Sequence, residues 1–216
     1  MPGASFLEVE RQLSAPPASP GGRHPLPDAD DFARAAGAAG IAEDVFVVAY
    51  DQGMTGGAAR LWWLLRHFGH DDVAVLDGGI GVWAGPLRAG EESIEPGGFV
   101  VRPRVDDSVE AEELERRLGE EGLVVVDARA PERYRGDVEP IDPVAGRIPG
   151  AVNVPFTSPE LPREVLAAEE IVVYCGSGIT ACVDVLALAR AGREDARLYT
   201  GSWSDWSGRG LPVERG

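Results

Sequence analysis

The chain has 216 residues, of which 36 are acidic and 20 are basic, so its formal charge is −16. This charge repels the phosphate backbone of nucleic acids, and every basic residue is an arginine, so no lysine-rich segment opposes it. The apolar runs are far shorter than the roughly 18 residues that a membrane span requires. We therefore expect a globular protein of one large or two small domains that binds neither nucleic acid nor membrane.

The cysteine content predicts the compartment. Cys175 and Cys182 are the only cysteines, too few for a disulfide scaffold. The first residues do not have the basic and then apolar pattern of a secretion signal. A reducing, cytoplasmic setting is the expectation.

An internal repeat dominates the chain, because residues 47–83 can be laid on residues 171–206. Each copy has an apolar run ending in tyrosine (Tyr50 and Tyr174), a glycine-bearing loop, a helical pattern and a second apolar run. Each copy then ends in a glycine, a short spacer and a tryptophan. The repeat predicts two related structural units.

Both copies read as strand, loop, helix and strand, which requires a parallel sheet and an α/β fold. The continuous apolar strands 45–50 and 171–174 are expected to be covered on both faces. Helical spacing predicts one buried stripe in each helix. The stripe residues are Ala58, Leu61, Trp62, Leu65 and Phe68 in the first copy, and Ile179, Cys182, Val183 and Leu186 in the second.

The copies differ upstream. Residues 1–4 match residues 148–151, but the second copy has a further strand at 123–127, whereas the first copy begins at Met1. The expected organisation is an incomplete, noncatalytic amino-terminal domain at 1–90, a linker at 91–104 that is rich in Gly, Pro and charge, and a complete catalytic domain at 105–216. Either the sequence is truncated at its start, or the first unit is structurally compromised.

Cys175 is the candidate nucleophile. It lies between a strand and a helix, and the glycines Gly176 and Gly178 let several backbone N–H groups face one point. The first turn of a helix favours an anion, so we expect a thiolate with a lowered pKa. Cys182 falls on the apolar stripe and is predicted to be a core residue. Asp51 or a neighbour stands in place of Cys175 in the first copy, so that unit is expected to lack the chemistry.

The loop of residues 175–181, CGSGITA, resembles the active-site loop of tandem-domain rhodanese-type sulfurtransferases, in particular the 3-mercaptopyruvate sulfurtransferase form. The thiosulfate-specific form usually has basic residues where Gly176 and Ser177 stand. Further matching motifs cover most of the chain: GRHPLP at 22–27, ARLWWLLRHFGHDDVAVLDGG at 59–79, VVDAR at 125–129, RYRG at 133–136, IPGAVNVPF at 148–156 and LYTGSWSDW at 198–206.

The resemblance implies tandem rhodanese-like domains, each a parallel sheet flanked by helices, the first incomplete. It also implies persulfide chemistry: the cysteine takes a sulfane sulfur from 3-mercaptopyruvate or thiosulfate and passes it to cyanide, a thiol or thioredoxin. No metal or organic cofactor is expected. A persulfide anion suits a ring of N–H donors.

Arg133 stands in the matching RYRG motif, and by this resemblance it corresponds to the family arginine that holds the carboxylate or sulfonate of the donor. His24 resembles a histidine that relays a proton through Ser177, with Glu10 as the weakly matched acid. The remaining loop positions expected around the sulfur are Gly176, Gly178, Ile179 and Thr180.

Two departures from the family pattern leave the preferred sulfur donor undecided between 3-mercaptopyruvate and thiosulfate. Arg147 replaces a usual histidine, and the second substrate arginine of many mercaptopyruvate enzymes has no clear match, since Asp142 and Pro143 occupy that segment. Two alternatives remain: thiosulfate:cyanide transfer as the main activity, or a noncatalytic rhodanese-like binding module. A phosphatase loop of the Cys-x5-Arg type is disfavoured, because Ala181 stands where its arginine would be.

Overall fold

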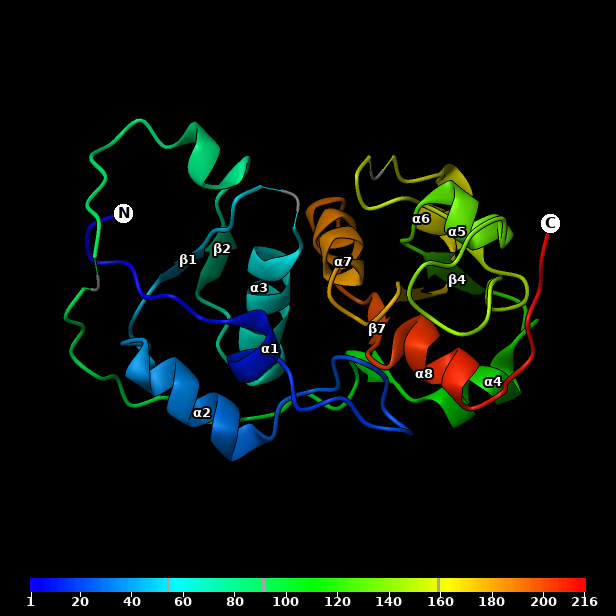
Figure 1. The fold of residues 1–216 in the computed structure, drawn as a ribbon, viewed down its shortest axis with the longest axis horizontal. Helices are drawn as coiled ribbons and strands as arrows, with labels where there is room; N and C mark the ends of the chain where they lie inside the picture. The colour runs from blue at the N-terminus through cyan, green and yellow to red at the C-terminus, as the bar shows by residue number, and fades with distance from the viewer. Residues whose placement is uncertain (54, 91, 159) are drawn as a thin grey trace. The chain divides into compact units, whose positions relative to one another are not determined.

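The computed structural model describes residues 1–53, 55–90, 92–158 and 160–216 (Figure 1). The chain forms two compact units. The first contains residues 1–15 and 26–104, and the second contains residues 16–25 and 105–216. The short segment 16–25 therefore belongs structurally to the carboxyl-terminal unit, although it lies early in the sequence.

The first unit has a two-stranded parallel sheet in which Val47 pairs with Val73. Helix α3 packs on this sheet, and Phe68 after its end stacks on Phe32 of α2 with ring centroids 4.7 Å apart. The elements of this unit are α1 (Val9–Gln12), α2 (Ala29–Ala38), β1 (Val47–Ala49), α3 (Gly57–His67), β2 (Val73–Val75) and the 3-10 helix η1 (Gly79–Val82).

Four residues of the predicted stripe, Ala58, Trp62, Leu65 and Phe68, are buried, but the fifth, Leu61, is only partly covered. The expectation that strand 45–50 is covered on both faces is wrong. Val48 in the middle of β1 is 48% exposed and Phe46 is 64% exposed, while Ala49 is buried. Burial alternates along β1 because the packed core covers only one face of the short sheet.

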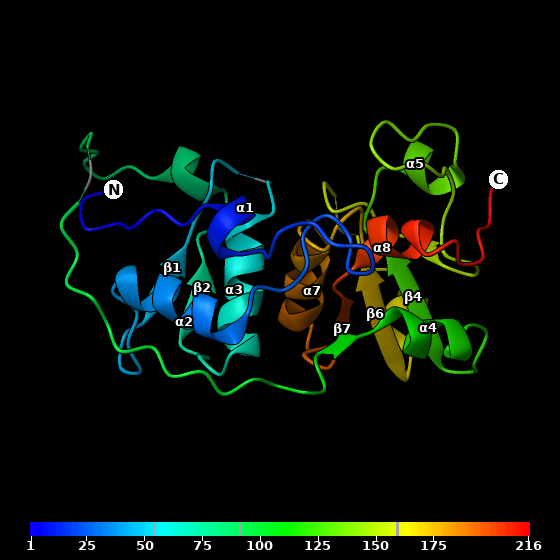
Figure 2. The same ribbon diagram turned by 60° about the horizontal axis from the view of Figure 1, so that its bottom comes forward.

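The second unit is built on a five-stranded parallel sheet with the order β3-β7-β6-β4-β5. Figure 2 labels its three middle strands, β7, β6 and β4. Its strands are β3 (Ser108–Val109), β4 (Leu123–Asp127), β5 (Val152–Asn153), β6 (Glu170–Tyr174) and β7 (Arg197–Tyr199). Its helices are α4 (Ala111–Arg117), α5 (Pro131–Arg135), α6 (Arg163–Ala167), α7 (Ala181–Arg190) and α8 (Ser202–Gly208). The predicted α/β class with parallel sheets and flanking helices is confirmed.

Strand β6 is central, and its last four residues, from Ile171 to Tyr174, are completely buried. This burial explains the unbroken apolar run, because helices cover both faces of a central parallel strand. The core cluster also contains Trp203 and Trp206 of α8, whose indole N–H groups donate to the carbonyls of Val144 and Pro212. The chain emerges from this core directly into the loop that begins at Cys175.

Helix α7 differs from the predicted stripe. Cys182 is fully buried as expected, but Val183 and Leu186 are only partly covered. The buried positions instead include Asp184 and Leu188, because α7 is rotated on the sheet relative to the purely apolar pattern. The apolar pattern therefore missed a buried carboxyl group.

Residues 16–25 are tied to α8. The Gly21 N–H donates to Asp205 Oδ1 at 2.7 Å, and the Arg23 N–H donates to Ser204 Oγ at 3.1 Å. Gly22 has φ +80°, and a methyl group at its Cα would lie 2.6 Å from Ser204 Oγ, so only glycine fits there. The expected linker at 91–104 groups with the first unit over its described residues.

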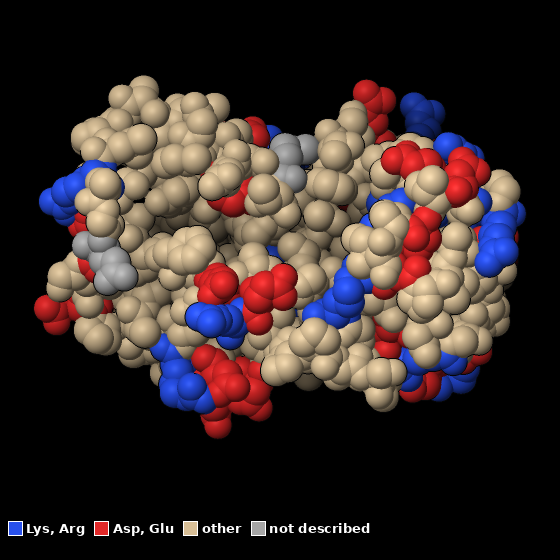
Figure 3. Space-filling view, viewed as in Figure 1, with Lys and Arg blue, Asp and Glu red and all other residues tan. Residues whose placement is uncertain are grey.

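Charged side chains of both signs lie side by side on the face shown in Figure 3. Within the second unit, Arg117 pairs with Glu170 at 2.6 Å, and Arg197 pairs with Glu113 at 2.6 Å. The net charge of −16 therefore does not prevent positive charge from gathering locally, because arginines lie among the acidic residues. No helix in the described parts of the chain has the length and apolar character of a membrane span.

Candidate active site

The loop between β6 and α7 brings a backbone N–H group to the sulfur of Cys175. The Gly178 N–H donates to Cys175 Sγ at an N···S distance of 3.1 Å. Gly178 has φ +86°, a conformation that glycine adopts without strain. Cys175 is 1% exposed, so its sulfur lies in a largely dry site. This arrangement can stabilise negative charge on sulfur.

Helix α8 fixes the position of this loop from its own amino end. The Cys175 N–H donates to Ser202 Oγ at 3.1 Å, and the Cys175 carbonyl accepts from the Trp203 N–H at 3.0 Å. Ser202 is fully buried and has φ +54°, which is unusual for a residue other than glycine. Ser202 was not predicted as a site residue. Its place in the matched LYTGSWSDW motif is the one sequence feature that could have pointed to such a role.

Two predicted residues are brought together at the loop. His24 Nδ1 lies 2.7 Å from Ser177 Oγ, which joins segment 16–25 to the active-site loop through a hydrogen bond. Ile179 is buried, and Thr180 is the N-cap residue of α7 but makes no side-chain cap hydrogen bond. Glu10 lies in α1 of the first unit, and its role as the acid stays a prediction.

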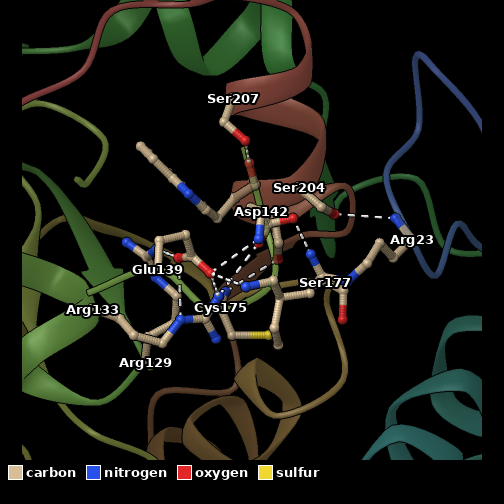
Figure 4. Close-up of polar contacts among 12 residues, drawn as sticks. Arg23, Arg129, Arg133, Glu139, Asp142, Cys175, Ser177, Ser204 and Ser207 are labelled. Carbon is tan, nitrogen blue, oxygen red and sulfur yellow. Dashed lines mark hydrogen bonds and ion pairs between the residues drawn. The ribbon is translucent and has the colours of Figure 1, made fainter. Parts of the chain in front are cut away.

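Arg133 lies in α5 and reaches the loop from the other side (Figure 4). Its Nε and Nη2 donate to Glu139 at 3.1 and 2.6 Å, and Nη2 also donates to Asp142 at 3.3 Å. Burial alone would raise the pKa of Glu139, but Arg133 and the backbone N–H of Asp142 outweigh it and lower that pKa. Glu139 therefore stays ionised and orients the guanidinium.

A buried ion pair supports the site. Arg129 Nη2 donates to Asp127 Oδ2 at 2.6 Å, and the Tyr174 hydroxyl donates to the same oxygen at 2.7 Å. Burial alone would lower the pKa of Arg129, but the hydrogen bonds and charge of Asp127 raise it above its usual range. The Arg129 guanidinium also lies 4.6 Å from the Trp203 ring centroid. Because its Nε and Nη2 bind Asp127 and its Nη1 pairs with Glu139, every nitrogen of Arg129 is used, and Arg129 acts as a support rather than an open anion site.

Within residues 1–53, 55–90, 92–158 and 160–216, no cluster of three His, Cys, Asp or Glu side chains has the arrangement to hold a metal ion. The groups gathered at Cys175 are instead a sulfur, a hydroxyl, an imidazole and guanidinium groups. These groups are suited to nucleophilic chemistry on an anionic substrate.

Comparison with known proteins gives the family. The model of the rhodanese-like domain matches residues 2–85 and 110–209. A Pseudomonas aeruginosa protein named as a 3-mercaptopyruvate sulfurtransferase is 45% identical over 228 residues, which span 95% of this chain and 80% of that protein. A Mycobacterium tuberculosis protein named as a thiosulfate sulfurtransferase is 40% identical over 245 residues, covering all of this chain and 83% of that protein.

The crystal structure of SseA, the 3-mercaptopyruvate enzyme of Escherichia coli, has a similar fold. It matches with a TM-score of 0.79 and 32% sequence identity, over 94% of this chain and 83% of that one. The family model, the relatives and the fold agree over both units. This chain therefore belongs to the rhodanese family and is a sulfurtransferase.

Proposed function

We propose that this chain moves a sulfane sulfur from 3-mercaptopyruvate, through a persulfide on Cys175, to a thiol or cyanide acceptor. The main support is the hydrogen bond from the Gly178 N–H to Cys175 Sγ in a loop that Arg133 also approaches. The chemistry belongs to the second unit, because Asp51 follows the equivalent strand in the first.

The first half-reaction forms an S–S bond and breaks a C–S bond. The Cys175 thiolate attacks the donor sulfur, and the electron pair of the C–S bond leaves on carbon 3 as the enolate of pyruvate. A proton moves from the donor sulfur to carbon 3, which gives pyruvate and a Cys175 persulfide anion. We assign this proton movement to Ser177 and His24, whose side chains lie 2.7 Å apart.

The second half-reaction returns the free enzyme. An acceptor thiolate or cyanide attacks the outer persulfide sulfur, the S–S bond breaks, and its electron pair returns to Cys175. The acceptors would be a small thiol, thioredoxin or cyanide, giving a persulfide or thiocyanate. A persulfide carries its charge one atom beyond Sγ, so the backbone N–H groups that begin α7 and the Arg133 guanidinium would stabilise it.

Thiosulfate is the second donor. Attack of the Cys175 thiolate on its outer sulfur gives the same persulfide and releases sulfite, and no proton transfer to carbon is needed. The two relatives described above are named for these two donors. We favour 3-mercaptopyruvate, because the loop has Gly176 and Ser177 where the thiosulfate-specific form usually has basic residues.

Intact-mass measurement tests the proposal. The protein is incubated with 3-mercaptopyruvate or thiosulfate without acceptor, and a gain of one sulfur atom that maps to Cys175 is expected. Kinetics with both donors side by side should give the higher kcat/KM for 3-mercaptopyruvate. If neither donor adds sulfur to Cys175, the chain is a noncatalytic binding module instead. We further propose a reducing, cytoplasmic setting, because two cysteines are too few for the disulfide scaffold typical of small secreted proteins.

A further inference from the structure

Two guanidinium groups lie against one side of the active-site loop. A methyl group placed on the Gly176 Cα would lie 3.0 Å from Arg23 Nη2 and 3.3 Å from Arg133 Nη1. Arg23 comes from segment 16–25 and Arg133 from α5, and Figure 4 shows both side chains beside Cys175. Two segments far apart in sequence therefore bring positive charge to the residue that follows the nucleophile.

Each guanidinium keeps at least one terminal nitrogen that makes no hydrogen bond within the described chain: Nη2 of Arg23 and Nη1 of Arg133. Arg133 binds Glu139 and Asp142 through Nε and Nη2, and Arg23 binds Asp142 through Nη1. Arg23 Nη2 and Arg133 Nη1 make no hydrogen bond to any part of the chain that the structure describes. These are the two atoms that a methyl group on Gly176 would meet first. Their N–H groups are available for a ligand at that point.

The carboxylate of Asp142 bridges the two arginines. It pairs with Arg23 and lies 3.3 Å from Arg133 Nη2, and its side chain is 4% exposed. A carboxylate held between two guanidinium groups is the same kind of contact that an anionic substrate would make. Asp142 therefore keeps the two arginines close together despite their like charge.

The backbone around Arg23 is held by the helix that also holds the loop. The Arg23 N–H donates to Ser204 Oγ at 3.1 Å, and the Ser204 N–H donates to the Gly176 carbonyl at 3.0 Å. Ser204 thus links Arg23 to Gly176 through one residue. This link fixes where the long Arg23 side chain begins, which lowers the entropy cost of placing its charge at the loop.

We propose that Arg23 is a second binding residue for the anionic group of the sulfur donor, acting with Arg133 across Gly176. The inference deepens the proposed function, since it names how the donor carboxylate is held. Because Gly176 has no side chain, the space between the two guanidinium groups and the loop stays open. The methyl group of an alanine there would require both guanidinium groups to shift by a few tenths of an ångström.

Alkylation of Cys175 with a charged and a neutral reagent tests the site apart from catalysis. Rates of labelling by iodoacetate and iodoacetamide are measured by peptide mass at Cys175 in the wild type, Arg23→Gln and Arg23→Lys. In Arg23→Gln the iodoacetate rate should fall about tenfold, and the iodoacetamide rate should stay unchanged. Arg23→Lys keeps the charge and should recover part of the iodoacetate rate.

Arg116→Gln is the matched control. Arg116 is exposed and precedes Arg117, which pairs with Glu170 at the first residue of β6. It therefore lies near the amino end of β6, whereas Cys175 follows the carboxyl end. Its two labelling rates should equal those of the wild type. An unchanged iodoacetate rate in Arg23→Gln, an equal fall for both reagents, or no recovery in Arg23→Lys would overturn the proposal.

Steady-state kinetics link the anion site to the reaction. In Arg23→Gln the KM for 3-mercaptopyruvate should rise about tenfold while kcat changes less than about twofold. A fall in kcat with unchanged KM would contradict a binding role. If the wild type turns over neither donor, the proposed function fails, but the labelling ratio still decides whether Arg23 and Arg133 form an anion site.

Discussion

The two strand-loop-helix units use the same loop position in opposite ways. Asp51 follows Tyr50 after β1 in the first unit, and Cys175 follows Tyr174 after β6 in the second. The Asp51 carboxylate accepts the N–H groups of Gly53 at 2.7 Å and Ala58 at 3.2 Å. In the second unit, Cys175 Sγ accepts the Gly178 N–H at 3.1 Å.

The loop after β1 already contains an anion, the carboxylate of Asp51. Burial alone would raise the pKa of Asp51, but the Thr55 hydroxyl and the backbone N–H groups of Ala58, Gly53 and Gly57 outweigh it and lower that pKa. A fixed carboxylate uses the donors that a substrate anion would need. The comparison indicates that the repeated loop is an anion-binding turn, and that the residue after the strand decides whether it is structural or reactive.

The helices after these loops also differ. Arg60 is the fourth residue of α3 and Asp184 is the fourth residue of α7, and both are fully buried. Arg60 Nε donates to the Leu13 carbonyl at 3.3 Å. Both Asp184 carboxylate oxygens have no hydrogen-bond partner among the residues that the structure describes. The second unit therefore has a destabilising buried acid close to its active-site loop.

Replacement of the nucleophile should have the largest effect. Cys175→Ser should lower sulfur transfer by at least about a thousandfold and abolish the gain of one sulfur, because a hydroxyl cannot form the persulfide. Cys182→Ser is the matched control, since Cys182 is a buried residue of α7. Turnover that survives in Cys175→Ser would remove Cys175 from the mechanism.

Replacement of the buried acid should stabilise the protein. Burial, with a smaller effect from Asp127, raises the pKa of Asp184 to about 8. The unfolded chain releases this proton near its ordinary pKa while the native state keeps it, so stability falls by about 1.4 kcal/mol per pH unit between the two values. Asp184→Asn should therefore gain about 3 kcal/mol of unfolding free energy between pH 5 and pH 7, relative to the wild type.

Urea unfolding at pH 5 and pH 7, followed by circular dichroism, measures this difference. Asp137→Asn is the control, because Asp137 has a 55% exposed side chain and pairs with Arg135 at the surface. It should show the same pH slope as the wild type. An equal slope in Asp184→Asn would mean that the Asp184 carboxyl is solvated in the native state.

Loss of the arginine over the reactive loop should weaken donor binding. Arg133→Ala should lower kcat/KM by about tenfold or more, as expected for a charged hydrogen bond of about 1.5–3 kcal/mol. Arg135→Ala in the same helix is the control, because Arg135 is half-exposed and pairs with Asp137. A kcat/KM equal to that of the wild type would exclude Arg133 from the site.

Removal of the built-in anion of the first loop should have the smallest effect. Asp51→Ala should lower stability by about 1 kcal/mol near pH 7, since the N–H groups of Gly53 and Ala58 then turn to water. The lowered pKa of Asp51 makes this contribution present above its ordinary pKa of 3.8, and it is lost as the pH falls through the lowered value. Sulfur transfer at pH 7 should stay unchanged. A large loss of transfer would contradict a purely structural role.

Several features of the fold and site follow from local pattern. The apolar run before Cys175 predicted the buried strand β6. Of the several N–H groups that the glycines were expected to turn toward the sulfur, the structure shows that of Gly178. The motif match of His24 and Ser177 anticipated a contact across 153 residues. By contrast, Val48 was expected to be buried and is half-exposed, and the buried position of Asp184 was not predicted. The periodicity of a strand or helix does not show which of its faces the rest of the chain covers.

The sequence by itself determined the repeat, the parallel α/β class and the cysteine loop, because each follows from the spacing of residues that are close together in the chain. Only the tertiary structure brought Arg23 to Asp142, 119 residues away, and placed Arg23 and Arg133 beside Gly176. It also assigned residues 16–25 to the second unit. The physical reason is that ion pairs and close backbone approaches between distant segments depend on packing, which leaves no periodic signal along the chain.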